Sequence, residues 1–191
     1  MNTAAPMSRL VRPEAASSAT RCSEGESKWS RVGLTLASGW FGVQVSAACG
    51  LGIKTMWADE ELARARALSL RPNPIYPTRD AAVERHLKLA GLIGLVPPDD
   101  VGDAALVQGD DGWTLAFDPA AFAVGAPDMA GLLAASRASV VLAAGEHDHM
   151  CAAHHLRALV HDPVILPGLG HNAHVQSPAM LWPLIERLVS L

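Results

Sequence analysis

The spacing of hydrophobic residues changes from one part of the chain to the next. Residues 1 to about 30 show no sustained apolar period and contain the polar cluster SEGESKWS, so we expect a leader with little fixed structure. From Arg31 the sequence becomes apolar and glycine-rich. The run VGLTLASGWFGVQVSAACGLGIKTMW at 32–57 predicts one or two buried strands, the last ending near Lys54. The side chains expected to be buried there are Val43, Val45, Ile53 and Met56.

The middle of the chain combines helix signals with turn signals. Residues 58–70 begin with acidic side chains and continue with strong helix formers, which predicts a helix. After the helix-breaking sequence RPNPIYP, Thr78 is a suitable N-cap for a second helix over 80–93. Residues 105–117 hold two short apolar segments around GDDG, which predicts a hairpin with Trp113 packed on one side.

The last third of the chain alternates helical and strand patterns. In order, the pattern predicts a helix at 129–138, a strand at 139–145, a helix at 151–160, a strand at 163–166 and a helix at 177–191. Two successive strand–helix units indicate an α/β domain with a parallel sheet. In the closing helix we expect Ser177 as N-cap, Pro178 as first residue and a kink at Pro183. Its expected apolar stripe is Leu181, Leu184, Ile185 and Leu188.

Composition narrows the functional class. The chain has 191 residues, half of them hydrophobic, which suits one soluble domain with a substantial core. A net charge of -4 without any basic block argues against nucleic acid or an anionic membrane as a partner. Three cysteines without CxxC spacing, and the absence of a secretory apolar segment, favour a reducing, cytoplasmic location.

Titratable residues concentrate after the strand predicted at 139–145, in the sequence GEHDHMCAAHH. Four histidines in this stretch raise the possibility of a metal site, or of a metal-dependent hydrolase. Metal ligands must converge on one point, however, and the sequence contains neither HExxH nor CxxC. It also lacks a phosphate-binding glycine loop, so we expect no metal and no nucleotide cofactor.

Two of these segments carry a family resemblance. SVVLAAGEHDHM, followed about twenty residues later by ILPGLGHNAHVQSP, resembles the C-terminal part of the α/β-hydrolase fold, whose chain order is nucleophile, acid, histidine. The resemblance implies that Asp148 is the catalytic acid and His171 the catalytic histidine. It also implies a partial α/β-hydrolase core at 31–58 and 128–191, with a mainly helical cap insertion at 59–127. Trp57, Tyr76 and Trp113 are candidates either for the lining of a pocket under that cap or for ordinary core packing.

The implied chemistry has a physical basis. A carboxylate at the end of one strand can hold the tautomer of an imidazole at the end of the next, and can stabilise the imidazolium. Gly168 and Gly170 would allow a tight loop that presents His171. The alternative is that His171 is an ordinary polar loop residue and Asp148 a helix cap. Glu146 is the rival acid.

The nucleophile is where the sequence departs from the family. No GxSxG pentapeptide occurs, and Ser38, Ser46 and Cys49 fit better as small packing residues. Some thirty leader residues also cannot supply the preceding strands of the fold.

The resemblance therefore implies a hydrolase of ester-like or related carbonyl groups in small molecules, impaired by truncation or a frameshift. A domain completed by another polypeptide and a decayed relative are alternative explanations. A binding or interaction module without catalysis is the alternative function, and an exposed sheet edge would favour association.

Overall fold

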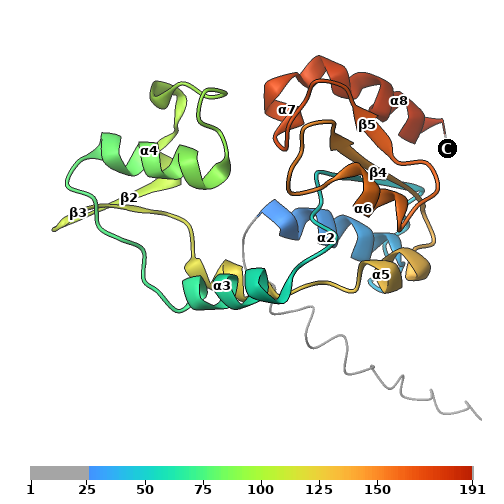
Figure 1. The fold of residues 1–191 in the computed structure, drawn as a ribbon, viewed down its shortest axis with the longest axis horizontal. Helices are drawn as coiled ribbons and strands as arrows, with labels where there is room; N and C mark the ends of the chain where they lie inside the picture. The colour runs from blue at the N-terminus through green and yellow to red at the C-terminus, as the bar shows by residue number, and fades with distance from the viewer. Residues whose placement is uncertain (1–25, 191) are drawn as a thin grey trace, which may run out of the picture.

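The structure, a computed structural model, describes residues 26–190, so most of the expected leader lies outside the described residues. Figure 1 shows two lobes side by side. We call residues 26–58 and 128–190 the sheet lobe, and residues 59–127 the hairpin lobe. The chain passes between them through α3 (Asp59–Ser69) and returns through the 3-10 helix η3 (Pro119–Val124), which packs against α3.

The sheet lobe is built on a parallel sheet with helices on both faces. Its strands are β1 (Ala47–Leu51), β4 (Ser139–Gly145) and β5 (Val164–Leu166), in the order β1-β4-β5. Helices α2 (Glu26–Ala37), α5 (Met129–Ala135) and α6 (Ala153–Arg157) lie on one face, and α8 (Trp182–Val189) lies on the other. Alternate residues of β4 therefore enter different cores: Leu142 packs with Leu156 of α6, whereas Val141 and Ala143 pack with Leu184 of α8.

Helix α2 corrects the prediction for the first part of the chain. The helix begins at Glu26, so residues 26–30 of the expected leader are helical, and no strand forms within 32–46. Leu34 and Ala37 are three residues apart and both buried, which is helical spacing, and Leu34 packs against Ile53. The strand itself is short and ends at Leu51 rather than near Lys54. Of the side chains expected to be buried, Val43 and Met56 are exposed.

The hairpin lobe matches its prediction closely. Helix α3 forms as expected, and α4 (Arg79–Ala90) begins where Thr78 Oγ1 accepts a hydrogen bond from the Ala81 amide at 3.2 Å. Strands β2 (Leu106–Gly109) and β3 (Gly112–Leu115) form the antiparallel hairpin. Short 3-10 helices η1 (Pro98–Asp100) and η2 (Asp103–Ala105) connect α4 to it. The lobe has its own buried core, made of Ala82, Val83, Leu87, Val101, Leu106 and Leu115.

The closing helix is divided in two. Residues 178–181 form a 3-10 turn, η4 (Pro178–Leu181), and α8 starts at Trp182 with Pro183 in its first turn. A proline has no N–H and is tolerated in the first turn of a helix. Pro183 therefore lies in the first turn of α8, and the kink expected within a longer helix does not form. Ser177 makes no side-chain cap, and Ile185 is 44% exposed rather than part of the buried stripe. None of the helices in the described part of the chain has the length and apolar character needed to cross a bilayer.

Candidate active site

Two loops meet at the carboxyl edge of the sheet, after β4 and after β5. The His147 amide of the first loop donates to the Leu169 carbonyl of the second at 2.8 Å. Gly145, the last residue of β4, makes this approach possible. A Cβ atom there would lie 2.3 Å from the carbonyl oxygens of Leu169 and Gly170, so no other residue fits without moving the second loop.

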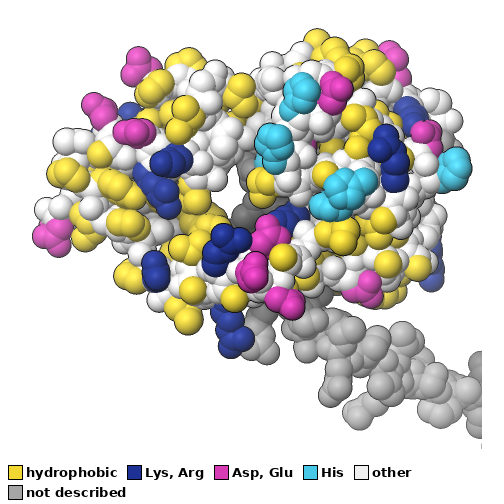
Figure 2. All heavy atoms as spheres, viewed as in Figure 1, with side chains coloured by type: hydrophobic (Ala, Val, Ile, Leu, Met, Phe, Trp, Pro, Cys, Tyr) yellow, Lys and Arg dark blue, Asp and Glu magenta, His cyan; other side chains and the backbone are white. Residues whose placement is uncertain are grey.

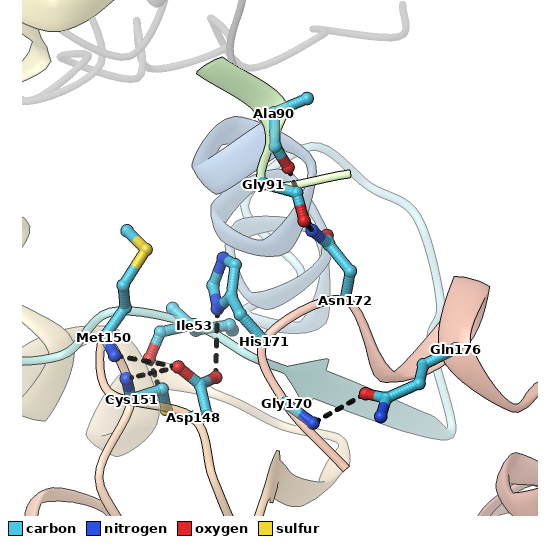
Figure 3. A network of polar contacts seen from close by, with 10 residues as sticks. All are labelled: Ile53, Ala90, Gly91, Asp148, Met150, Cys151, Gly170, His171, Asn172 and Gln176. Carbon is cyan, nitrogen blue, oxygen red and sulfur yellow. Dashed lines mark hydrogen bonds and ion pairs between the residues drawn. The ribbon is translucent and has the colours of Figure 1, made fainter. Parts of the chain in front are cut away.

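The contact expected between the acid and the histidine is present. His171 Nδ1 lies 2.9 Å from Asp148 Oδ2, and the other carboxylate oxygen accepts hydrogen bonds from the Met150 and Cys151 amides at 2.8 and 2.9 Å (Figure 3). The Asp148 side chain has no solvent exposure, whereas 30% of the His171 side chain is exposed. The pair thus joins a buried carboxylate to a partly exposed imidazole.

Hydrogen bonding sets the charge of the acid. Burial alone would raise the pKa of Asp148, but the hydrogen bonds from the His171 ring and from the Cys151 and Met150 amides outweigh it. The pKa of Asp148 therefore lies below its usual value. An ionised Asp148 favours the tautomer of His171 with the proton on Nδ1, which leaves the lone pair of Nε2 to accept a proton.

The rival acid has a different partner. Glu146 is exposed, and its Oε2 accepts a hydrogen bond from the Gly168 amide at 2.9 Å. This bond connects the loop after β4 to the loop after β5. Gly168 has the left-handed conformation expected of a tight turn, with φ +69°. Gly170 does not have a positive φ. Its amide donates instead to Gln176 Oε1 at 2.8 Å (Figure 3).

The remaining histidines of the first loop do not converge. His147, His149 and His154 are exposed, and His155 is half-buried with its ring edge against His154. Among residues 26–190 there is no group of three or more histidine, cysteine, aspartate or glutamate side chains that could hold a metal ion. Of the aromatic candidates for pocket lining, Tyr76 and Trp113 pack against the core of the hairpin lobe.

The three side chains weighed as nucleophiles lie away from the carboxyl edge. Ser38 is buried at the end of α2, where its hydroxyl donates to the Thr35 carbonyl at 2.6 Å. Ser46 precedes β1 and accepts a hydrogen bond from Ser139, the first residue of β4. The Cys49 thiol lies within β1, and burial raises its pKa to about 11, so it is a thiol at neutral pH.

The position of α2 reveals a signal that the sequence reasoning missed. The Ala37 carbonyl at its end accepts from the Arg137 amide, just before β4, whereas Leu34 packs on Ile53, just after β1. The helix therefore runs from the carboxyl edge to the amino edge. Its first two residues are Glu26 and Ser27, which together with Gly25 in the sequence match the first three positions of GxSxG, with Trp29 in place of the last glycine.

Figure 2 shows a hollow between the two lobes, with histidine side chains on the sheet-lobe side of it. The loop after β1 reaches the same region: a Cβ atom on Gly52 would lie 3.3 Å from the His171 carbonyl oxygen and 3.5 Å from Nδ1. Three strand-end loops of the sheet lobe thus surround His171, as expected for ligand sites in open parallel sheets.

The fold is that of known hydrolase structures. The chain is similar to the crystal structure of E-2-(acetamidomethylene)succinate hydrolase, with a TM-score of 0.62 and 20% identity over 85% of this chain and 63% of that one. It is also similar to a thioesterase domain from the curacin biosynthetic pathway, with a TM-score of 0.61 and 15% identity over 82% of this chain and 63% of that one. A putative hydrolase from Rickettsia typhi gives a TM-score of 0.63 and 12% identity over 85% and 59% of the two chains.

These similarities define the class: the chain has a partial α/β-hydrolase fold. It spans less than two thirds of the length of each of these three chains. No protein-family model and no curated protein sequence matches it.

Proposed function

We propose that the chain acts as a hydrolase on an ester-like or related carbonyl group of a small molecule, with Asp148 as the acid and His171 as the base. The observation that supports this most is the 2.9 Å contact between a fully buried carboxylate and a partly exposed imidazole at a strand-end edge. Two of the structurally similar proteins, a hydrolase and a thioesterase domain, are consistent with this type of reaction.

In the proposed reaction, His171 Nε2 takes the proton of a hydroxyl group as its oxygen attacks the substrate carbonyl. Asp148 stabilises the imidazolium that results. The tetrahedral intermediate then expels its leaving group, which receives the proton from His171. Water, activated in the same way, releases the acid product and restores the hydroxyl.

Ser27 is our first candidate for that hydroxyl. Its backbone lies in the first turn of α2, the end of the helix nearest the carboxyl edge, and Gly25 occupies the first position of the pentapeptide. Trp29 replaces a glycine that the elbow needs for a strained turn, so we expect turnover well below that of a complete elbow.

The hairpin lobe is proposed to be the cap. It borders the hollow between the lobes and packs around a core of its own, so it can shape a binding site without taking part in the reaction.

A binding module without catalysis is the second candidate. It is favoured by the absence of a GxSxG sequence and by the distance of Ser38, Ser46 and Cys49 from the carboxyl edge. In this case the acid–histidine pair would serve only to hold the two loops together.

The deciding experiment is labelling with a fluorophosphonate, followed by peptide mapping, alongside turnover of a short-chain ester. The hydrolase proposal predicts a labelled serine, and loss of both labelling and turnover in His171→Ala. Ser27→Ala tests the nucleophile, with Ser46→Ala as the matched control. If the folded protein shows neither labelling nor turnover, the binding module replaces the hydrolase.

A further inference from the structure

Asn172 follows His171 directly and is almost completely buried, with 4% exposure. It is the N-cap residue of α7 (Ala173–Gln176), a position where asparagine usually accepts a hydrogen bond from the first turn of the helix. Its side chain makes no such cap. The amide is instead turned away from its own helix and toward the hairpin lobe (Figure 3).

Its partners are the last carbonyl groups of α4. Asn172 Nδ2 donates to the Ala90 oxygen at 2.9 Å and to the Gly91 oxygen at 3.0 Å. Carbonyls at the end of a helix have no partner within the helix, and the left-handed Gly91, with φ +67°, ends α4 here. Two donors of one amide thus satisfy two carbonyls of the other lobe.

We propose that Asn172 is a latch: a positioning residue that holds the hairpin lobe against the histidine loop and thereby controls access to His171. If the hairpin lobe moves away, the amide loses both hydrogen bonds together, and the amide and the two carbonyls must be hydrated instead, which is a net loss for each bond. The two hydrogen bonds of Asn172, the residue next to His171, therefore favour the arrangement in which the hairpin lobe lies against the histidine loop. This inference rests on the role proposed for His171, but its test does not require turnover.

The chain contains a matched control for this chemistry. Asn73 Nδ2 also bridges two main-chain carbonyls, those of Leu115 and Phe117, but donor and acceptors all belong to the hairpin lobe. Asn73→Asp therefore removes the same kind of interaction without touching the connection between the lobes. In both Asn→Asp variants a carboxylate faces carbonyl oxygens, and the change in volume is minimal.

The experiment measures the rate at which diethyl pyrocarbonate modifies His171 in the full chain, resolved from the other histidines by peptide mapping. We expect Asn172→Asp to raise this rate about tenfold, because losing two hydrogen bonds increases the open population. Asn172→Ala should act in the same direction without adding a charge. Asn73→Asp should leave the rate within about twofold.

Two results would overturn the latch: an unchanged rate in both Asn172 variants, or an equal rise in Asn73→Asp, which would indicate general loosening. Far-ultraviolet circular dichroism of each variant checks that it has folded. Ester turnover is measured separately. A latch effect without any turnover would refute the hydrolase proposal alone, and turnover with an unchanged modification rate would refute the latch alone.

Discussion

The two lobes differ in how far apart in the sequence their paired strands lie. In the hairpin lobe, the cap of α4 and the turn between β2 and β3 involve residues no more than a few positions apart. In the sheet lobe, β1 pairs with β4 across some ninety residues, and the Asp148–His171 contact joins two separate loops. This contrast explains why Asp148 and His171 meet in the sheet lobe: pairing of strands from separate segments brings the loops at their ends to one edge.

The largest effects should come from the two cores. Leu142→Ala in β4 and Leu87→Ala in α4 each remove a buried side chain and should each cost about 2–5 kcal/mol of unfolding free energy. Hydrogen exchange measured peptide by peptide should show which lobe each substitution destabilises. We expect Leu142→Ala to expose amides around the acid and histidine loops, and Leu87→Ala to expose amides of the hairpin lobe. Equal loss of protection in β4 for both variants would mean that the lobes unfold as one unit.

The Asp148–His171 pair should make the sheet lobe sensitive to acid. Because the pKa of Asp148 is lowered by folding, its contribution is complete above the pKa of the unfolded chain, about 3.9, and is lost as pH falls through the lower folded value.

Asp148→Asn keeps an oxygen for the Met150 and Cys151 amides but loses the charge. We expect it to cost about 1–3 kcal/mol near neutral pH and progressively less as the pH falls below 4. Urea unfolding of both proteins across this range tests the sign. A difference that grows as pH falls would contradict the assignment of a lowered pKa.

A smaller comparison uses one helix cap from each lobe. Thr78 caps α4 in the hairpin lobe, and Asp128 caps α5 in the sheet lobe by accepting from the Gly131 amide at 2.8 Å. Each substitution by alanine should cost about 1 kcal/mol, measured by urea unfolding. A loss of protection from hydrogen exchange in the opposite lobe would show that the caps are coupled between lobes.

The weakest effect concerns the second edge of β1, with which no described strand pairs. Residues 32–53 contain no charged side chain, and edges without charge tend to pair with another copy of themselves. We expect concentration-dependent self-association in light scattering, which Ser46→Lys should reduce. Thr114→Lys in the hairpin lobe is the comparison. A monomer at every concentration would refute pairing through this edge.

Local signals account for what the sequence predicted well. A threonine before a helical pattern, here Thr78, indicates the start of a helix. The sequence GDDG between two apolar segments indicates a hairpin turn. Both signals depend only on residues that are close in the sequence. The strands at 139–145 and 163–166 were also recognisable, because buried parallel strands are continuous apolar runs. Their order then indicated that Asp148 and His171 would follow neighbouring strands.

Non-local packing accounts for the errors. The run at 32–46 is apolar enough for a strand, and only the burial of Leu34 against Ile53 shows that its first part is a helix. Ile185 has the spacing of the predicted stripe, but α8 packs on the sheet through Leu184 and Leu188, which leaves Ile185 exposed. Short apolar segments are compatible with several structures, and their partners decide among them.

By itself, the sequence determined the residue types at the strand ends, the glycines between them and the order of acid and histidine, since these follow from local periodicity and chain order. Only the tertiary structure decided that Asp148, rather than Glu146, reaches His171, that α2 starts at the carboxyl edge, and that Asn172 holds the end of α4. The reason is geometric. A hydrogen bond forms or fails within a few tenths of an ångström, and that precision arises only when distant segments are packed together.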